Sequence, residues 1–206
     1  MGTVVTYRGA EPLFEATLAR LGPRLAASGY RGYVNLNTIV DEAGVWPLEL
    51  TCRFGYPGFA ILEALHRTPW DELLLRVGRG EGVDLETQDG FSVGVVLTVP
   101  PFPYHHAYER IGKGSPVLLA GHFGAADLAH LHFGEMKRED GELRTAGQIG
   151  YAMVVTGRGT TLEQAQADAY ARVDGVTIAN VRYRNDIGER LRREDMATLR
   201  RLGWLP

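Results

Sequence analysis

Several features that would narrow the function of a protein are scarce or missing in this 206-residue sequence. A single cysteine, Cys52, excludes an internal disulfide and suits a reducing compartment. No apolar run approaches the roughly 18 residues that span a bilayer, so we expect no membrane segment. The stretch from Met1 to Val5 lacks a basic region followed by a long apolar core, which predicts no signal peptide. These absences favour a soluble, cytoplasmic protein.

A strong charge of one sign is also missing. The chain has 22 Lys and Arg against 25 Asp and Glu, a formal net charge of −3. This balance gives no support for a nucleic-acid partner. An arginine-rich stretch near the C-terminus is interleaved with acids, which indicates a solvated helix face over about residues 188–202. We find no internal repeat and no low-complexity tract.

One segment, residues 47–54, alternates between apolar and polar side chains with the period of a β-strand. The apolar positions, which we expect to be buried, are Leu48, Leu50, Cys52 and Phe54. The polar positions on the other face are Glu49, Thr51 and Arg53. A carboxylate, a hydroxyl and a guanidinium on one face suit a cleft that holds a metal ion and an anionic substrate.

The preceding strand, residues 32–40, is separated from this one by turn residues 41–44 and predicts a β-hairpin. A loop with an odd number of residues places Asn35 and Asn37 on the face of Glu49 and Thr51, whereas an even loop buries both amides. Burying an unpaired amide costs about 1–3 kcal/mol. We therefore expect the odd loop and a cleft face that includes both asparagines.

Periodicity and capping signals divide the rest of the chain into helices and strands. Helices are expected at about residues 11–28, 59–66, 69–79, 160–173 and 188–202. Further strands are expected at about residues 4–7, 92–99, 129–136, 148–156 and 176–183, with a turn at 137–142. Residues 80–90 are rich in glycine and acids, which predicts a boundary between two units, 1–88 and 89–206. The fold class is α+β.

Three motifs resemble those of the glycinamide ribonucleotide synthetase (phosphoribosylamine–glycine ligase) family of ATP-grasp enzymes. They are the strand Leu48–Gly55 with its hairpin, the strand-to-helix step Val154–Ala165, and the segment Val181–Gly188, which contains Asp186-Ile187-Gly188. Their order and approximate spacing are similar to the family's. The resemblance implies the last part of an ATP-grasp domain, an antiparallel sheet with helices, followed by the family's C-terminal domain, a small mixed β-sheet with one or two helices.

The resemblance also implies site residues. Glu49 and Thr51 are expected to hold Mg²⁺ (or Mn²⁺) with ATP, and Asn35 and Asn37 to line the cleft. The expected substrate- or phosphate-binding residues are Arg53, Gly55, Arg184 and Asp186. The sequence departs from the family pattern at two places: Thr51 replaces an asparagine, and Tyr56-Pro57-Gly58 replaces Asp-Pro-Glu.

Each of these assignments has a structural alternative. Glu49 and Arg53 could form an ion pair with each other, and Arg182, Arg184 and Asp186 could anchor the C-terminal helix.

The pairs His105-His106 and His130/His132 could form a zinc site if they converged. The segment Gly112–Ser115 lacks the glycine spacing of a phosphate loop and predicts a turn.

The expected function is part of an ATP-dependent carboxylate–amine ligase of purine biosynthesis. The N-terminal half of the ligase, or a separate subunit, would be its partner, with ATP and small carboxylate and amine substrates. We expect no activity from this part alone. The alternative is a non-catalytic module that keeps the scaffold and binds a ligand or a partner.

Overall fold

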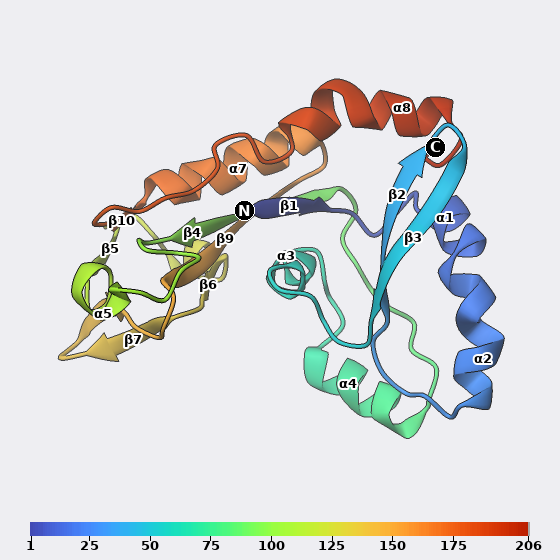
Figure 1. The fold of residues 1–206 in the computed structure, drawn as a ribbon, viewed down its shortest axis with the longest axis horizontal. Helices are drawn as coiled ribbons and strands as arrows, with labels where there is room; N and C mark the ends of the chain where they lie inside the picture. Colours follow the sequence, from blue (N-terminus) through green and yellow to red (C-terminus); the bar gives the residue numbers. More distant parts are fainter. Residues whose placement is uncertain (206) are drawn as a thin grey trace.

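A four-stranded antiparallel sheet forms the centre of the protein in a computed structural model that describes residues 1–205. Its strand order is β1-β4-β9-β6 (Figure 1). The central strands β4 (Phe91–Thr98) and β9 (Tyr151–Gly159) are buried along nearly their whole length. A strand that is covered on both faces needs apolar side chains at successive positions, which explains the valine-rich sequence of both strands.

Two helices cover opposite faces of this sheet. On one face, α7 (Leu162–Asp174) packs on β4 and β9 through small side chains such as Ala165 and Ala169. On the other face, Ala60 and Ile61 of α3 (Gly58–Glu63) contact the sheet. The sheet therefore lies in the middle of the hydrophobic core.

The remaining elements lie around this core or extend away from it. The strands are β1 Gly2–Val5, β2 Asn35–Asp41, β3 Gly44–Thr51, β5 Val117–Leu119, β6 Leu131–Phe133, β7 Met136–Glu139, β8 Glu142–Thr145 and β10 Val176–Ile178. The helices are α1 Glu11–Ala16, η1 Leu18–Leu21, α2 Gly22–Ala27, α4 Trp70–Arg79, α5 Tyr108–Ile111, α6 Ala125–Leu128, η2 Leu191–Asp195 and α8 Met196–Arg201. The β2–β3 hairpin stands apart from the central sheet (Figure 1).

Five predicted elements differ from the structure. The strand expected at 129–136 is interrupted, because β6 ends at Phe133 and β7 begins at Met136 in another sheet. The helix expected at 11–28 is broken into α1, η1 and α2. Pro23 has no N–H to donate, so it lies in the first turn of a new helix, α2, that begins at Gly22. The expected turn at 137–142 is a hairpin, β7–β8, whose two central residues Asp140 and Gly141 have φ of 50° and 83°. The strand expected at 176–183 ends at Ile178. The terminal helix begins as a π-helical turn, η2, and continues as α8.

The α+β fold class is confirmed, and every strand pairing in residues 1–205 is antiparallel. The division into units 1–88 and 89–206 stays a prediction. Strand β1 belongs to the first range and is hydrogen-bonded to β4 of the second. Within residues 1–205, no helix has both the length and the apolar character needed to cross a membrane.

Candidate functional site

The polar face of the β2–β3 hairpin brings together four of the predicted site residues. Asn35 lies directly opposite Thr51, and Asn37 lies opposite Glu49. Residues paired in this way point to the same side of a sheet. The Asn35 side-chain amide donates to Asn37 Oδ1 at 3.2 Å. Asn35, Asn37, Glu49 and Thr51 therefore share one face of the hairpin, and their role as the lining of a cleft stays a prediction.

The structural feature that produces this register differs from the predicted one. The loop is even, because Asp41 pairs with Gly44 and only Glu42 and Ala43 lie between them. The register then shifts by one residue at Leu48, where Asn37 pairs with Glu49 and Thr38 with Pro47. A β-bulge inserts one unpaired residue and so reverses the parity that the loop sets. The expected odd loop was wrong, and the bulge supplies the same face.

Glu49 is exposed and forms no ion pair with any residue that the structure describes. Arg53, two residues after the end of β3, donates from Nη1 to the Phe54 carbonyl oxygen at 3.2 Å. The alternative of a Glu49–Arg53 pair is therefore not seen. A carboxylate, a hydroxyl and two amide oxygens on one face form the set of hard oxygen donors that Mg²⁺ prefers, so the residues fit this ion.

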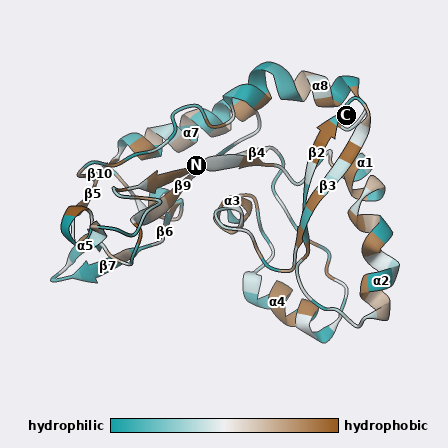
Figure 2. Cartoon of the chain, in the orientation of Figure 1, coloured by the Kyte–Doolittle hydropathy of each residue, from teal (hydrophilic) through white to brown (hydrophobic). Residues whose placement is uncertain are grey.

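The apolar side of β3 was expected to be buried and is not. Leu48 and Leu50 are 62% and 46% exposed, and Cys52 is exposed as well. No other element of residues 1–205 adds a strand to the β2–β3 pair. Figure 2 shows hydrophobic colouring along both strands of this hairpin. The alternation is real, but the sheet layer that would cover it is not supplied by the described residues.

The other predicted binding residues lie on separate elements. Gly55 begins the turn into α3, where its carbonyl oxygen accepts from the Phe59 N–H at 2.9 Å. Arg184 and Asp186 follow β10 and form a two-pronged ion pair, with Nε–Oδ1 at 2.7 Å and Nη2–Oδ2 at 2.5 Å. The Arg184 carbonyl also accepts from Tyr170 of α7 at 2.9 Å. These contacts fasten the segment to α7 and do not join it to the hairpin.

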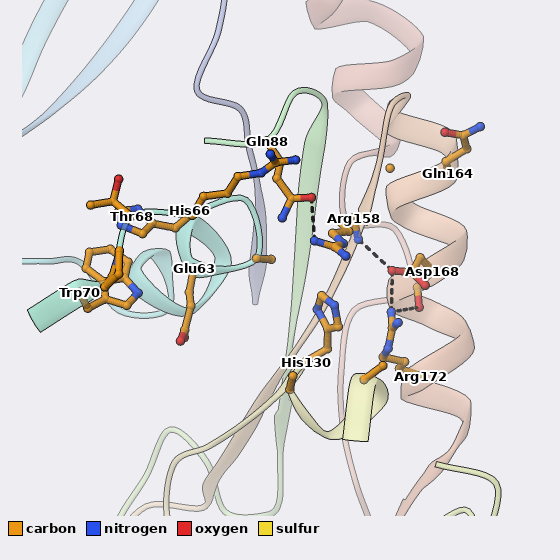
Figure 3. A pocket seen from close by; sticks show the side chains of 16 residues that line it. Glu63, His66, Thr68, Trp70, Gln88, His130, Arg158, Gln164, Asp168 and Arg172 are labelled. Atoms are coloured by element: carbon orange, nitrogen blue, oxygen red, sulfur yellow. Dashed lines mark hydrogen bonds and ion pairs between the residues drawn. The ribbon is translucent and has the colours of Figure 1, made fainter. Parts of the chain in front are cut away.

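A pocket of about 840 Å³ lies between the α3–α4 segment and the β9–α7 step. Figure 3 shows His130, Arg158, Asp168 and Arg172 along one wall, and Glu63, His66 and Trp70 along the other. The imidazole of His66 stacks on Trp70 with ring centroids 4.0 Å apart. None of the predicted magnesium- or phosphate-binding residues lines this pocket.

Ion pairs hold one wall of the pocket. Arg172, whose side chain is 14% exposed, lies 2.5 Å from Asp168 Oδ2 and 3.3 Å from Asp127 Oδ1. Asp168 also accepts from the Arg158 backbone N–H at 2.9 Å. Burial works to raise the pKa of Asp168, but these donors outweigh it and lower the pKa overall. Asp168 is therefore ionised and offsets the charge of Arg172.

The histidines of the predicted zinc alternative do not form a metal cluster. Across residues 1–205, no group of three or more His, Cys, Asp or Glu is arranged to hold a metal ion. His130 and His132 instead both contact the hydroxyl of Thr156, at 2.9 and 3.1 Å. Sequence alone gives no signal for this contact, because it depends on the pairing of β6 with β9.

Comparison with known proteins bears on the whole chain. Residues 92–190 match the family described as phosphoribosylglycinamide synthetase, C domain. The phosphoribosylamine–glycine ligase of Mycobacterium leprae is 30% identical over 187 residues, which cover 89% of this chain. The chain resembles the C-terminal part of phosphoribosylamine–glycine ligase. It spans about two fifths of the length of the ligases it matches, 41% for M. leprae and 42% for Thermotoga maritima.

Solved structures agree with this resemblance. The T. maritima phosphoribosylamine–glycine ligase superposes with a TM-score of 0.68 at 26% identity, covering 91% of this chain and 46% of that one. The biotin carboxylase domain of Hydrogenobacter thermophilus 2-oxoglutarate carboxylase gives a TM-score of 0.57 at 12% identity, covering 97% and 46%. The likeness to the ligase extends over 91% of this chain, and the likeness to the carboxylase shows the fold alone.

Proposed function

We propose that this chain is one part of an ATP-dependent carboxylate–amine ligase of the phosphoribosylamine–glycine ligase type, and that it supplies the metal-binding hairpin and the C-terminal domain. The observation that carries the proposal is the polar face of β2–β3, where Glu49 has no ion-pair partner among residues 1–205. An exposed carboxylate that faces an amide and lies beside a hydroxyl, without a neutralising cation, suits a cation ligand.

Glu49 would be the charged ligand of Mg²⁺ in the assembled enzyme, with Thr51 as a neutral second ligand. Bound Mg²⁺ would bridge the phosphates of ATP and offset the charge that develops during phosphoryl transfer. Asn35 and Asn37 would line the same face. Arg53 would bind an anionic group of the nucleotide or substrate through its two-pronged donor geometry.

The rest of the ligase would be the partner that covers the hairpin. An isolated two-stranded sheet is marginal in water, because each strand leaves one edge unpaired. The exposed Leu48 and Leu50 add an apolar surface beside those edges. A complementary part that extends this sheet would bury both, so we expect the chain to turn over ATP only in the assembly.

Reconstitution tests the proposal. The chain is mixed with the N-terminal part of the T. maritima phosphoribosylamine–glycine ligase that it does not span, and ADP release is measured with Mg²⁺, glycine and phosphoribosylamine. Glu49→Gln should reduce the rate at least tenfold, while Glu42→Gln in the exposed turn of the same hairpin should change it less than twofold. An equal loss in both variants, or no assembly at all, would contradict the proposal.

A non-catalytic binding module is the second candidate, and the observation that favours it lies just after β3. Tyr56 and Gly58 provide no carboxylate where the family pattern has two, and Tyr56 packs on Tyr151 with ring centroids 4.7 Å apart. Under this reading, Glu49→Gln leaves assembly with the partner and ligand binding unchanged, and no ATP turnover is seen in either form.

A further inference from the structure

Four side chains form a continuous series from α3 to the wall of the 840 Å³ pocket. Glu63 Oε2 lies 3.4 Å from His132 Nδ1, and His132 Nε2 lies 3.1 Å from the Thr156 hydroxyl. The same hydroxyl lies 2.9 Å from His130 Nδ1. We call this series the Glu63–His130 chain. Thr156 is fully buried, and its hydroxyl also lies 3.4 Å from the His130 backbone carbonyl oxygen, a longer contact than those to the two imidazoles.

The carboxylate at one end sets the direction of every proton in the chain. Burial lowers the pKa of His132, so its ring carries a single proton. The ionised Glu63 carboxylate, 3.4 Å from Nδ1, favours that proton on Nδ1, which leaves Nε2 to accept from Thr156. The hydroxyl oxygen of Thr156 then accepts from Nδ1–H of His130. The opposite order would place the lone pair of His132 Nδ1 against the Glu63 carboxylate, which is repulsive.

His130 is therefore left with an unprotonated Nε2 and no protein partner for it within residues 1–205. Burial, reinforced by the Arg172 charge, lowers the pKa of His130 to about 4. The imidazole is neutral at physiological pH and offers a fixed acceptor to the pocket. Figure 3 shows its ring directed toward Arg158.

Arg158 and Arg67 give the pocket positive charge that no ion pair neutralises, and the Glu63 carboxylate lines the opposite wall. The Arg158 guanidinium donates to Gln88 Oε1 at 2.8 Å, a neutral partner. Within residues 1–205, neither Arg158 nor Arg67 has a carboxylate within ion-pair distance. The charge of Arg172, in contrast, is offset by Asp127 and Asp168. The pocket thus combines available cations with a neutral acceptor.

We propose that this pocket binds a small anion that carries its own O–H or N–H donor, with the anionic group on Arg158 and the donor on His130 Nε2. The Glu63–His130 chain selects such ligands because it presents a lone pair where another anion would meet repulsion. This proposal concerns the pocket alone and holds whether or not the assembly acts as a ligase.

The tautomer of His130 is the first test. In the full chain labelled with ¹⁵N, long-range ¹H–¹⁵N spectra at pH 7.5 should show His130 protonated on Nδ1 and bare on Nε2. Thr156→Ser keeps the hydroxyl and should keep that tautomer, whereas Thr156→Val should lose it. A proton on Nε2 of His130 in the unmodified chain would overturn the proposal.

Ligand selectivity is the second test. Monohydrogen phosphate carries a donor and sulfate does not, so phosphate should bind at least tenfold tighter at pH 7.5 and constant ionic strength. Glycolate, which carries a hydroxyl donor, and acetate, which does not, form a matching pair of carboxylates. The pair with the larger ratio of affinities shows whether the pocket prefers a phosphate or a carboxylate group. Equal affinity within both pairs, or no binding of any of the four, would refute the proposal.

Variants assign the effect to residues. His130→Asn keeps a donor for Thr156 but removes the Nε2 acceptor, so it should weaken phosphate about tenfold and leave sulfate unchanged. Arg158→Gln should weaken both anions. Backbone amide spectra check that each variant is folded, and the selectivity of the unmodified chain tests the proposal even if a variant does not fold. If neither His130→Asn nor Arg158→Gln changes phosphate binding, the anion binds elsewhere and the proposal is overturned.

Discussion

Replacing Glu135 by alanine should destabilise the central sheet, because one carboxylate holds the whole segment that leads into β9. Its two oxygens accept backbone N–H groups from four successive residues, Gln148 to Tyr151, at 2.7–3.3 Å. Each hydrogen bond to a charged group contributes about 1.5–3 kcal/mol in isolation. The sum over the hydrogen bonds is smaller than these values suggest, because the donors share two acceptor oxygens and the carboxylate is partly exposed. We therefore expect Glu135→Ala to lower the free energy of unfolding by about 3 kcal/mol.

The assay is urea denaturation at pH 7, followed by circular dichroism. A loss of about 3 kcal/mol corresponds to a fall in Tm of about 6–12 °C for a protein of this size. Glu135→Gln keeps one acceptor and loses the charge, and should cost about half as much. Glu109→Gln, which removes an exposed pair with Lys113, is the control and should cost less than about 1 kcal/mol.

The pH dependence gives a second measurement. Burial acts to raise the pKa of Glu135, but the four backbone donors together lower it below the usual value. A folded-state pKa below the unfolded value means that the stabilisation is present above about pH 4.3 and lost as the pH falls through the folded value. The advantage of Glu135 over glutamine should therefore shrink in acid. A loss under 1 kcal/mol for Glu135→Ala, or a glutamine variant with the same pH profile, would refute this reasoning.

Three further changes probe the packing and the exposed hairpin. Gly157→Ala should lower the free energy of unfolding in urea by at least 1–3 kcal/mol, because its Cβ would collide with the backbone of Ala169 in α7. A change below about 0.5 kcal/mol would contradict that packing. Thr161→Ala should cost about 1 kcal/mol in the same assay, since its hydroxyl caps the Gln164 N–H at 3.2 Å, and Thr161→Ser should restore most of it. Cys52 should react with a thiol reagent in the folded chain at a rate near that of the denatured chain, and protection would show that the hairpin is covered.

The sequence predicted the local elements well where a strong signal was present. The helix from residue 69 to 79 corresponds to α4, and it ends at Gly80, whose φ of 74° suits glycine. The helix expected at residues 160–173 corresponds to α7, which is capped by Thr161 and Gln164. The break at Pro23 was missed because the leucine periodicity on either side continues through it.

The candidate site on the hairpin was also predicted in part and missed in part. The alternation along residues 47–54 identified which side chains share a face, since side-chain direction in a strand has a period of two. It did not identify the bulge at Leu48, and it predicted a buried apolar face that the structure leaves exposed. Burial depends on what packs against a strand, which the pattern of that strand alone does not contain.

The sequence by itself therefore determined the family resemblance, the main secondary structure, and the alternation that groups Asn35 with Asn37 and Glu49 with Thr51. The bulge at Leu48, which the structure revealed, places the two pairs on one face. Only the tertiary structure brought His130 and His132 to Thr156, and Arg158 to the same pocket. Neighbours within a strand or helix are set by its regular repeat, whereas these groups meet because β6 pairs with β9 and α7 packs across the sheet. Such long-range pairing is decided by the packing of the whole core.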